Sequence, residues 1–262
     1  MILTCDIGNT TVALSGVERD GADYRVLFTV KTGSDRDMTA KECRNRLYER
    51  LQELGVPQMQ PEGSILSSVV PELTETLVQA LTGLTGTDPL RVRWSAVPNL
   101  TYAIPHPEKL GQDRIADAVR AARRYPLPVL TVDMGSATTC NVIGPGGVFL
   151  GGMISPGIAT GLQMLSTKTA QLPLVDLGSE THLIGRDTTE CLLSGATYGV
   201  AAMVDGLAER ISEELGAPVT VVITGGLARY AEPLCRCEHI YDPDHLTKGL
   251  AYLYDTEREN LF

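Results

Sequence analysis

The feature that most constrains this chain is a short acidic turn that occurs twice. Asp6-Ile7-Gly8-Asn9-Thr10 follows an apolar, strand-like start, and Asp133-Met134-Gly135-Ser136-Ala137-Thr138-Thr139 repeats the arrangement in the middle of the chain. One Asp-x-Gly turn predicts only a hairpin, because Gly and Asp also serve ordinary tight turns. Two copies, each opening one half of the chain, instead predict a duplicated fold with paired turns.

Length and charge narrow the class of protein. The 262 residues suffice for two domains, which we expect at residues 1–118 and 119–262. The formal charge of −10 argues against nucleic acid as a partner, because phosphate backbones would repel such a chain. Asp6 interrupts the apolar start, so no signal peptide is expected, and no apolar run approaches the roughly 20 residues of a membrane span. These features predict a cytoplasmic protein that binds no membrane.

Cysteine and histidine are not spaced as metal ligands. The cysteines lie mostly in apolar patterns without C-x-x-C spacing, which favours reduced packing residues, and the close pair Cys235-Arg236-Cys237 is interpreted as incidental. The four histidines show no ligand spacing, so no zinc site is expected.

Hydrophobic periodicity predicts a similar order of elements in both halves. In the first half we expect strands at residues 2–6, 11–17, 24–30, 64–70 and 90–97, and helices at 39–54 and 71–81. In the second half we expect helices at 113–125, 159–168, 187–215 and 245–254, a short helix after residue 226, and strands at 129–133, 138–143, 148–154, 219–223 and 239–241. The fold class is therefore α/β, with two duplicated domains, a mixed sheet flanked by helices in each, and a cleft between them.

The residue types of the two turns suit phosphate and cation binding. Backbone N–H groups of a Gly-containing turn can converge on a phosphate, and Gly lacks the Cβ that would block it. A carboxylate repels phosphate, so Asp6 and Asp133 are expected to hold a cation, or water on a cation, that faces the phosphates. Hydroxyl donors accompany both turns, at Thr10, Thr11, Ser136 and Thr138. Thr224-Gly225-Gly226, at the end of a later strand, would let a ring or ribose approach the backbone, although such a tripeptide more often only starts a helix.

A third segment, Gly111-Gln112-Asp113-Arg114, enters a predicted helix near the junction of the halves. Alone, an Asp at a helix start indicates a cap and an Arg beside it a solvated neighbour. The position at the junction favours a substrate site, because a hydroxyl held there could face the phosphate turns. A helix N-terminus stabilises a carboxylate and attracts anions, and Arg114 offers a forked donor for a carboxylate or phosphoryl oxygen.

In their order these segments resemble the type III pantothenate kinase family. The matching motifs are Asp6-x-Gly-Asn-Thr, Ser67-Ser68-Val-Val-Pro71, Gly111-x-Asp-Arg, Asp133-x-Gly-x-x-Thr, Gly151-Gly-x-Ile-x-Pro-Gly157, Thr224-Gly225-Gly226 and Leu246-Thr-Lys-Gly-Leu250. No single motif is specific, but their joint order spans almost the whole chain. The resemblance implies a duplicated ribonuclease-H-like fold of the acetate and sugar kinase, heat-shock and actin superfamily, and a homodimer.

The resemblance also implies an activity and a set of site residues. Family members phosphorylate pantothenate with ATP, the first step toward coenzyme A, and use Mg²⁺ and a monovalent cation, K⁺ or NH₄⁺. Asp113 is then the proton acceptor, Asp133 binds the monovalent cation, Ser136 contacts ATP, and Thr188 contacts pantothenate across the dimer. The implied ATP phosphate loop comprises Asp6, Ile7, Gly8, Asn9, Thr10, Thr11, Val12 and Ala13, and the implied pantothenate site Gly111, Gln112, Asp113 and Arg114.

Two positions depart from the family's pattern. Ser136 stands where relatives usually carry Thr, and because it keeps the hydroxyl we expect the contact with ATP to survive. Ile104 stands where many relatives carry an aromatic residue, and Tyr102 is a candidate replacement. Asp187 could cap the helix that begins near Thr188, so the role of Thr188 rests on the resemblance alone.

The expected reaction is in-line transfer of the ATP γ-phosphoryl group to the primary hydroxyl of pantothenate. An unperturbed Asp113, with a pKa near 3.9, would be a weak base, which the loose transition state of phosphoryl transfer tolerates. Two alternatives stay open. A regulatory relative that binds nucleotide or a protein partner without turnover is expected to have lost Asp113, Arg114 or Asp133, and a sugar or acetate kinase of the same superfamily does not need Gly111-x-Asp-Arg.

Gly195 and Gly199 lie four residues apart in the long predicted helix at residues 187–215. This spacing permits another helix to approach closely, either inside one subunit or at a dimer contact.

Overall fold

The fold is described from a computed structural model, which covers residues 1–55, 61–97, 100–179 and 181–259. The protein is divided into two compact units. Unit 1 comprises Met1–Leu100, Pro105–Arg120 and Asp244–Phe262, and unit 2 comprises Thr101–Ile104 and Ala121–Pro243. The chain thus leaves unit 1 two residues after the expected boundary at 118. Residues 101–104 and the segment from Asp244 onward are assigned differently from that expectation, because pairing and packing over long sequence separations decide where they belong.

The sheet of unit 1 is mixed and has the strand order β3-β2-β1-β4-β5. β1 (Ile2–Ile7), β2 (Thr11–Asp20) and β3 (Asp23–Gly33) form the expected antiparallel meander. β4 (Gly63–Ser68) lies parallel to β1, and β5 (Leu90–Arg91) lies parallel to β4. Because parallel neighbours end at the same edge, the first acidic turn lies beside the end of β4.

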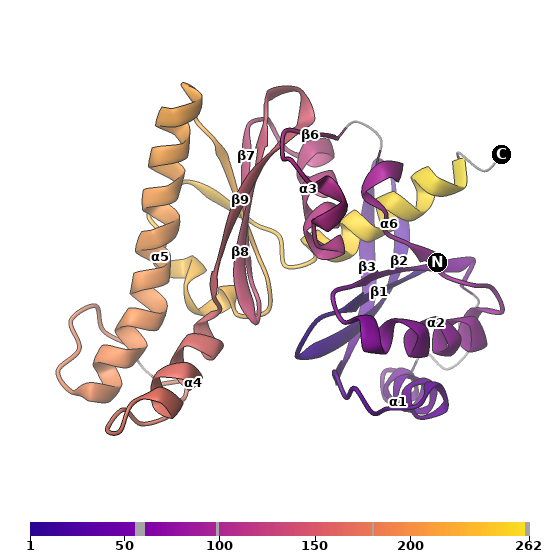
Figure 1. Cartoon of the computed structure of the whole chain (residues 1–262), viewed down its shortest axis with the longest axis horizontal. Coiled ribbons are helices and arrows are strands. Elements are labelled where there is room, and N and C mark those ends of the chain that lie inside the picture. The colour runs from indigo at the N-terminus through magenta and orange to yellow at the C-terminus, as the bar shows by residue number, and fades with distance from the viewer. Residues whose placement is uncertain (56–60, 98–99, 180, 260–262) are drawn as a thin grey trace. The chain divides into compact units, whose positions relative to one another are not determined.

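Helices cover both faces of this sheet (Figure 1). α1 (Ala40–Glu53) and α2 (Pro71–Thr85) pack on one face around a core that includes Leu3, Cys5 and Ile7 of β1. α6 (His245–Glu259) packs against β1, β3 and β4 on the other face. α3 (Gln112–Arg124) begins in unit 1 and carries the chain toward unit 2.

The ends of α1 and α2 follow from local sequence. Thr39 forms a capping box with Glu42 at the start of α1, so two backbone N–H groups of the first turn have side-chain partners. Pro71 starts α2, where its missing N–H has no consequence, and Gly86, at φ 77°, ends it in the left-handed conformation.

The sheet of unit 2 repeats that of unit 1, with the strand order β11-β10-β7-β8-β9-β6. β7 (Val129–Met134), β8 (Ala137–Gly144) and β9 (Val148–Pro156) form an antiparallel meander. β10 (Thr220–Thr224) lies parallel to β7, and β11 (His239–Tyr241) lies parallel to β10. Apart from the short edge strand β6 (Thr101–Tyr102), the order matches unit 1 strand for strand, so the predicted duplication is confirmed.

Two helices accompany this sheet, α4 (Ile158–Lys168) and α5 (Thr188–Leu215), and Figure 1 shows α5 running alongside β7–β9. The buried residues of α5 recur every three or four positions, and Val204, Ala208 and Ile211 join the core of the sheet. Gly195 and Gly199 lie instead on the exposed side of α5, so they do not pack in the core of their own subunit.

Among the described residues, α5 is also long and apolar enough to cross a membrane by length and composition. This differs from the expectation that no apolar run approaches that length. Length and composition are weak evidence, because the core helix of a soluble protein meets the same criteria.

The segment 90–97 differs from expectation. Only Leu90 and Arg91 pair, as β5, and Trp94–Ala96 forms a 3-10 turn, so the expected strand at 90–97 is wrong over most of its length. β5 lies at the edge of the sheet, and its pairing with β4 covers two residues, Ile65 and Leu66. The strand is short because it has a neighbour on one side and few backbone partners there. Two other 3-10 turns are η2 (Pro107–Lys109) and η3 (Pro145–Gly147). The short helix expected after residue 226 is instead a pair of 3-10 turns, η4 (Ala228–Tyr230) and η5 (Glu232–Leu234).

Candidate active site

The first acidic turn is held by its own backbone and by the residue that follows β3. The Gly8 N–H donates to the Thr11 carbonyl at 3.0 Å, and the Ser34 N–H donates to the Thr10 carbonyl at 3.1 Å. The Ser34 hydroxyl donates to the Gly8 carbonyl at 2.6 Å. Sequence reasoning did not single out Ser34, because no local pattern indicates a contact across 26 positions.

The residues implied for the ATP phosphate loop differ in what they can offer a ligand. Asn9 and Thr10 are exposed, and Asp6, Gly8, Thr11 and Ala13 are partly exposed. Ile7 and Val12 are completely buried, and their side chains belong to the core under α1 and α2. These two residues can therefore contribute only backbone atoms to a phosphate site.

Ser67 lies beside Asp6 on the neighbouring strand. The parallel register of β1 and β4 pairs the two residues, so their side chains emerge from the same face of the sheet. Ser67 is completely buried, and within the described residues its hydroxyl has no hydrogen-bond partner. An unpartnered buried hydroxyl is costly, which marks this position beside Asp6 as a candidate part of the site.

The start of α3 is attached to the same edge of the sheet. The Gln112 Oε1 atom accepts a hydrogen bond from the Ser68 N–H at 2.8 Å, at the end of β4. In the first turn of the helix, the Asp113 Oδ1 atom accepts from the Arg114 N–H at 2.8 Å. Gly111, Gln112, Asp113 and Arg114 are all half-buried. Unit 1 alone therefore brings together the first acidic turn, the end of β4 and the implied pantothenate segment.

The electrostatics of Asp113 differ from the sequence-based assumption of an ordinary aspartate. Burial raises the pKa of Asp113 above its ordinary value of 3.8, against the opposing effects of the Arg114 N–H and the Arg114 charge. A raised pKa makes the carboxylate a better proton acceptor near neutral pH, provided that it stays ionised. The position and this shift are typical of a general base.

The second acidic turn, in unit 2, has a different support. The Gly135 N–H donates to the Ala137 carbonyl at 3.0 Å, and the Thr160 hydroxyl of α4 donates to the Ser136 carbonyl at 2.6 Å. The Gly157 N–H also donates to the Ser136 carbonyl, at 3.2 Å. The Ser136 side chain itself is exposed. Ser136 is thus fixed through its backbone by the start of α4, and its hydroxyl lies at the surface.

Asp133 lies against Gly225 of the Thr224-Gly225-Gly226 segment. The parallel register pairs Asp133 with Thr224, and Gly225 follows with φ +98°, which only Gly adopts readily. A Cβ at Gly225 would overlap the Asp133 Oδ1 atom and would lie 2.6 Å from the Met134 carbonyl oxygen. The position is therefore crowded, because the Gly225 backbone packs directly against the Asp133 carboxylate and the Met134 backbone, and any larger residue would displace that carboxylate. Carboxylate oxygens are donors that hard cations such as K⁺ or Mg²⁺ prefer.

The two turns are related but not identical. Ile7 pairs with Val12 across the first turn, whereas Met134 pairs with Thr138 across the second, so the first turn is one residue longer. When the two motifs are aligned on their Asp and Gly residues, β1 and β7 therefore correspond residue by residue, whereas β2 and β8 are offset by one residue.

Thr188 is the first residue of α5 and is exposed. The cap is Asp187, whose Oδ1 atom accepts from the Glu190 N–H at 2.8 Å. The hydroxyl of Thr188 is therefore not needed to start the helix.

Tyr102 and Ile104 lie beside β9 in unit 2. Tyr102, in β6, contacts the Phe149 ring with a centroid separation of 6.1 Å, and burial raises the pKa of its hydroxyl to about 12. Ile104 lies beside Gly151, with 3.9 Å between the Ile104 Cγ2 atom and a Cβ built on that glycine. Both residues are thus attached to the second sheet.

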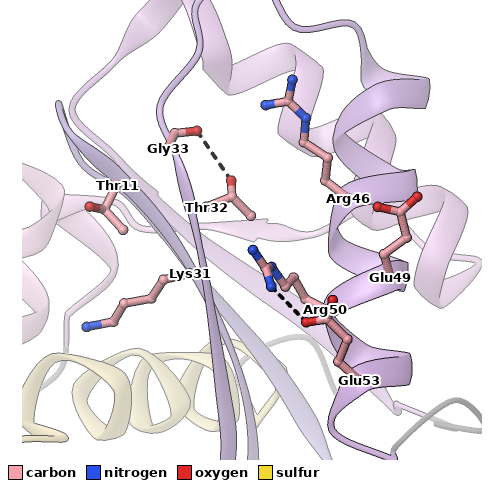
Figure 2. Close-up of a pocket in the computed structure, with 8 residues that line it drawn as sticks. All are labelled: Thr11, Lys31, Thr32, Gly33, Arg46, Glu49, Arg50 and Glu53. Carbon is pink, nitrogen blue, oxygen red and sulfur yellow. Dashed lines mark hydrogen bonds and ion pairs between the residues drawn. The ribbon is translucent and has the colours of Figure 1, made fainter.

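A groove of about 530 Å³ lies beside Thr11 in unit 1. Figure 2 shows Thr11 and Lys31 on the sheet side of this groove and four charged residues of α1 opposite. Arg50 pairs with Glu53 at 2.7 Å, and Arg46 pairs with Asp35 at 3.5 Å, so acids offset the arginines. Of the residues implied for the ATP phosphate loop, Thr11 alone lines this groove, so the groove and the implied loop share a single residue.

Within the described part of the chain, no group of three or more His, Cys, Asp and Glu side chains is placed to hold a metal ion. Cation binding at Asp6 or Asp133 would therefore have to draw on backbone carbonyls, hydroxyls, water or the phosphates themselves.

Solved structures of other proteins share this fold. A ROK hexokinase from Thermus thermophilus aligns over 99% of this chain and 99% of its own, with a TM-score of 0.52 and 17% identity. A Baf family transcriptional activator from Campylobacter jejuni aligns over 98% of this chain and 99% of its own, with a TM-score of 0.58 and 22% identity. At these identities the likeness concerns the fold, which is the duplicated α/β architecture of the ROK kinases and their structural relatives.

The particular family follows from sequence. The family model for type III pantothenate kinase matches residues 2–210. The type III pantothenate kinase of Moorella thermoacetica is 34% identical over 255 residues, which cover 97% of this chain and 99% of the relative. The chain belongs to the type III pantothenate kinase family, as its motifs predicted.

Proposed function

We propose that this chain transfers the γ-phosphoryl group of ATP to the primary hydroxyl of pantothenate, giving 4'-phosphopantothenate, the first step of coenzyme A biosynthesis. The observation that carries this proposal is the placement of Asp113. Its carboxylate has a raised pKa and lies at the start of α3. Gln112 attaches that helix to the end of β4, the edge of the sheet that also bears the first acidic turn. The membership of the family supplies the substrates.

In this mechanism Asp113 orients the hydroxyl and accepts its proton. The hydroxyl oxygen forms a bond to the γ-phosphorus while the bond from that phosphorus to the β–γ bridging oxygen breaks, and ADP leaves. Arg114 neutralises the pantothenate carboxylate or the migrating phosphoryl group. Catalysis then rests on position and charge, which is what a half-buried carboxylate in a fixed helix turn can provide.

The turns hold ATP. Backbone N–H groups of residues 6–13 bind its phosphates, and the Ser136 hydroxyl contacts it from the second turn. Mg²⁺, when bound near Asp6, supplies neutralisation of the phosphate charge. Asp133 holds the monovalent cation, K⁺ or NH₄⁺, and the close packing of Gly225 against its carboxylate supports this role because it fixes the place of that carboxylate.

We also propose a homodimer, in which unit 2 of one subunit contacts unit 2 of the other. The interface consists of the exposed side of α5 together with exposed apolar residues of β9, α4 and the segment before α5. Gly195, Gly199 and Ala202 are exposed on α5, and Leu183, whose carbonyl accepts from the Ser194 hydroxyl of α5 at 2.6 Å, is 59% exposed. Exposed large apolar side chains are typical of protein interfaces. They continue over unit 2 at Leu150, Met153, Ile154, Met164, Leu165 and Ile184. Thr188 lies in this region and would complete the partner's pantothenate site. A cytoplasmic location suits an enzyme that uses ATP.

Purified protein tests the activity. We expect ATP-dependent phosphorylation of pantothenate, stimulated by K⁺, and no comparable reaction with glucose or acetate. Asp113→Asn should lower kcat by at least about a hundredfold, at the lower end of what general base catalysis contributes. Asp20→Asn, at an exposed hairpin position, is the matched control and should leave kcat unchanged. Turnover of a sugar or acetate in place of pantothenate, or nucleotide binding without any turnover, would exclude the proposal.

A further inference from the structure

The C-terminal helix α6 holds a buried polar contact with α3, the helix that carries Asp113. His245, at the first position of α6, is completely buried, and its Nε2 atom lies 3.0 Å from the carbonyl oxygen of Asp117. Because a carbonyl only accepts, His245 donates this hydrogen bond. α6 lies beyond the residues that the family model matches. The contact joins two segments 128 positions apart.

One turn further along α6, the two helices approach through Gly249. A Cβ at this position would overlap the carbonyl oxygen of Ala116 and would lie 3.2 Å from the Cβ of Arg120. Gly249 therefore lets the backbones of α3 and α6 touch, and any side chain would push the helices apart. This explains the glycine in the Leu246-Thr-Lys-Gly-Leu250 motif, which the substrate and ATP sites do not use.

The contacted face of α3 is the face that bears Asp113. Ala116 and Asp117 lie three and four positions after Asp113, and Arg120 lies one turn further, so all four side chains follow one stripe of the helix. α6 thus touches α3 one turn below the proposed base. A shift of α3 on α6 would move Asp113 with it, because one turn of helix is too short to absorb the displacement.

α3 is also attached to the sheet. Arg120 is buried, and its Nη2 atom donates to the Asp23 Oδ2 atom of β3 at 3.0 Å. The Arg120 guanidinium, together with the Tyr24 N–H and Lys248, lowers the pKa of Asp23 although burial alone would raise it. The pair is therefore charged at neutral pH, and it joins α3 to the edge strand of unit 1.

The far end of α6 is fixed to the same sheet. The Tyr254 hydroxyl donates to the Glu62 carbonyl at 3.2 Å, and a Cβ at Gly63 would overlap that hydroxyl. Arg19 of β2 donates from Nε to Asp255 at 2.8 Å and from Nη1 to Glu62 at 2.8 Å. The C-terminal half of α6 is therefore attached to the sheet that carries Asp6, and its N-terminal half packs against α3.

We propose that His245 and Gly249 are positioning residues for the phosphoryl-transfer step, because they fix the position of α3 against α6, which packs on the sheet, and so set the place of Asp113 relative to the first acidic turn. Neither residue touches substrate. The inference rests on the proposed function for its kinetic consequences, but the placement of Asp113 can be measured without turnover.

The experiment compares four variants of the full chain with the wild type. Gly249→Ala introduces the overlap with Ala116, His245→Leu removes the donor to Asp117, and His245→Gln keeps an amide donor. Gly83→Ala is the matched control, because this exposed helical glycine in α2 faces only the flexible end of Arg44. Each variant is assayed for kcat and for KM with ATP and pantothenate, and the Asp113 carboxyl is titrated by NMR.

We expect Gly249→Ala and His245→Leu to lower kcat by about ten- to a hundredfold, since a misplacement of about 1 Å can cost a factor of that size. The KM values should change by less than about threefold, because the lost interaction is made in the transition state. The pKa of Asp113 should move down toward its ordinary value as water enters, with Arg114 as the charged neighbour that favours ionisation. His245→Gln and Gly83→Ala should resemble the wild type.

The inference would be overturned if Gly249→Ala and His245→Leu fold but keep the wild-type kcat and the wild-type titration of Asp113. It would equally fail if activity fell only with the fraction of folded protein, since that indicates a merely structural role. If Gly249→Ala does not fold, the two His245 variants decide. A wild type inactive on pantothenate would remove the proposed function, whereas the titration would still decide whether α6 positions Asp113.

Discussion

The Gln112 Oε1 atom accepts a hydrogen bond from the Ser68 N–H at 2.8 Å, across 44 positions of sequence. Through this bond the start of α3 is attached to the end of β4, whose register with β1 places Ser67 opposite Asp6. The resemblance implied a substrate contact for Gln112, and that contact stays a prediction; the structure shows in addition that the side-chain oxygen of Gln112 is bonded to the end of β4. Gln112 therefore connects the proposed base to the phosphate turn within a single unit.

Gln112→Ala is expected to impair both stability and turnover. It leaves the half-buried Ser68 N–H without its acceptor, which should destabilise the fold by about 1 kcal/mol. It also frees the first turn of α3, so we expect kcat to fall by about tenfold or more. Urea denaturation and steady-state kinetics measure the two effects. Gln79→Ala, on the exposed side of α2, is the matched control, and an equal loss of activity in both variants would contradict this role.

The pH dependence of the reaction should report Asp113. Because burial raises its pKa, the acidic limb of kcat/KM should lie above the ordinary aspartate value of 3.8. Activity is present above that limb, where the carboxylate is ionised, and is lost as the pH falls through it. A pH profile measured with saturating ATP tests this. A limb at or below the ordinary value would show that desolvation does not control the proposed base.

The same shift predicts that Asp113→Asn stabilises the protein while it inactivates it. A carboxyl whose folded pKa is raised costs stability at every pH above that pKa, because ionisation is easier in the unfolded chain. The cost vanishes below the unfolded pKa, where both states are protonated. Thermal unfolding at pH 7 should therefore show a higher Tm for Asp113→Asn, and at pH 3 the difference should disappear. A lower Tm at pH 7 would contradict the assigned burial penalty.

Local sequence patterns identified most of the fold. The two Asp-x-Gly turns, the meanders on either side of them and the helices α1 and α5 carry strong periodic or turn signals, and the structure contains each of them. The signals failed where an element is defined by its partner. β6 has only two residues, and β5 ends after two, because sheet edges rather than composition decide their length.

Sequence motifs can propose some residues of the candidate site and cannot show how they are held. Asp6, Asp113 and Asp133 could be selected because an acid beside Gly or at a helix start is visible in a motif. Ser34 and the actual contact of Gln112 could not, since both depend on residues far away in sequence. The raised pKa of Asp113 depends on burial, which no motif encodes. The return of α6 to unit 1 is likewise a matter of packing over long range.

Gly225→Ala should disturb the cation site that we propose at Asp133 of the second turn. The new Cβ would overlap the Asp133 carboxylate and force a φ of +98° on Ala, which should destabilise the fold by about 1–3 kcal/mol. We also expect a higher K⁺ concentration for half-maximal activity. Gly216→Ala is the control, because this residue also has a positive φ, of 66°, but a Cβ there meets no atom within 4 Å. If both variants lose stability equally and keep the same response to K⁺, Asp133 does not hold the monovalent cation.

Heterodimers should reveal whether Thr188 serves the partner's site. Thr188→Glu places a larger, negatively charged side chain at the proposed contact with the anionic pantothenate, so this variant and Asp113→Asn should each be nearly inactive as homodimers. If each site combines Asp113 of one subunit with Thr188 of the other, a heterodimer of the two variants contains one site with both changes and one with neither. Heterodimers purified through two different tags should then regain about half of the wild-type activity. Thr189→Glu, the same change at the next exposed position, should leave the homodimer active. Inactive heterodimers would show instead that both residues serve the site of their own subunit, because each of the two sites would then contain one of the two substitutions.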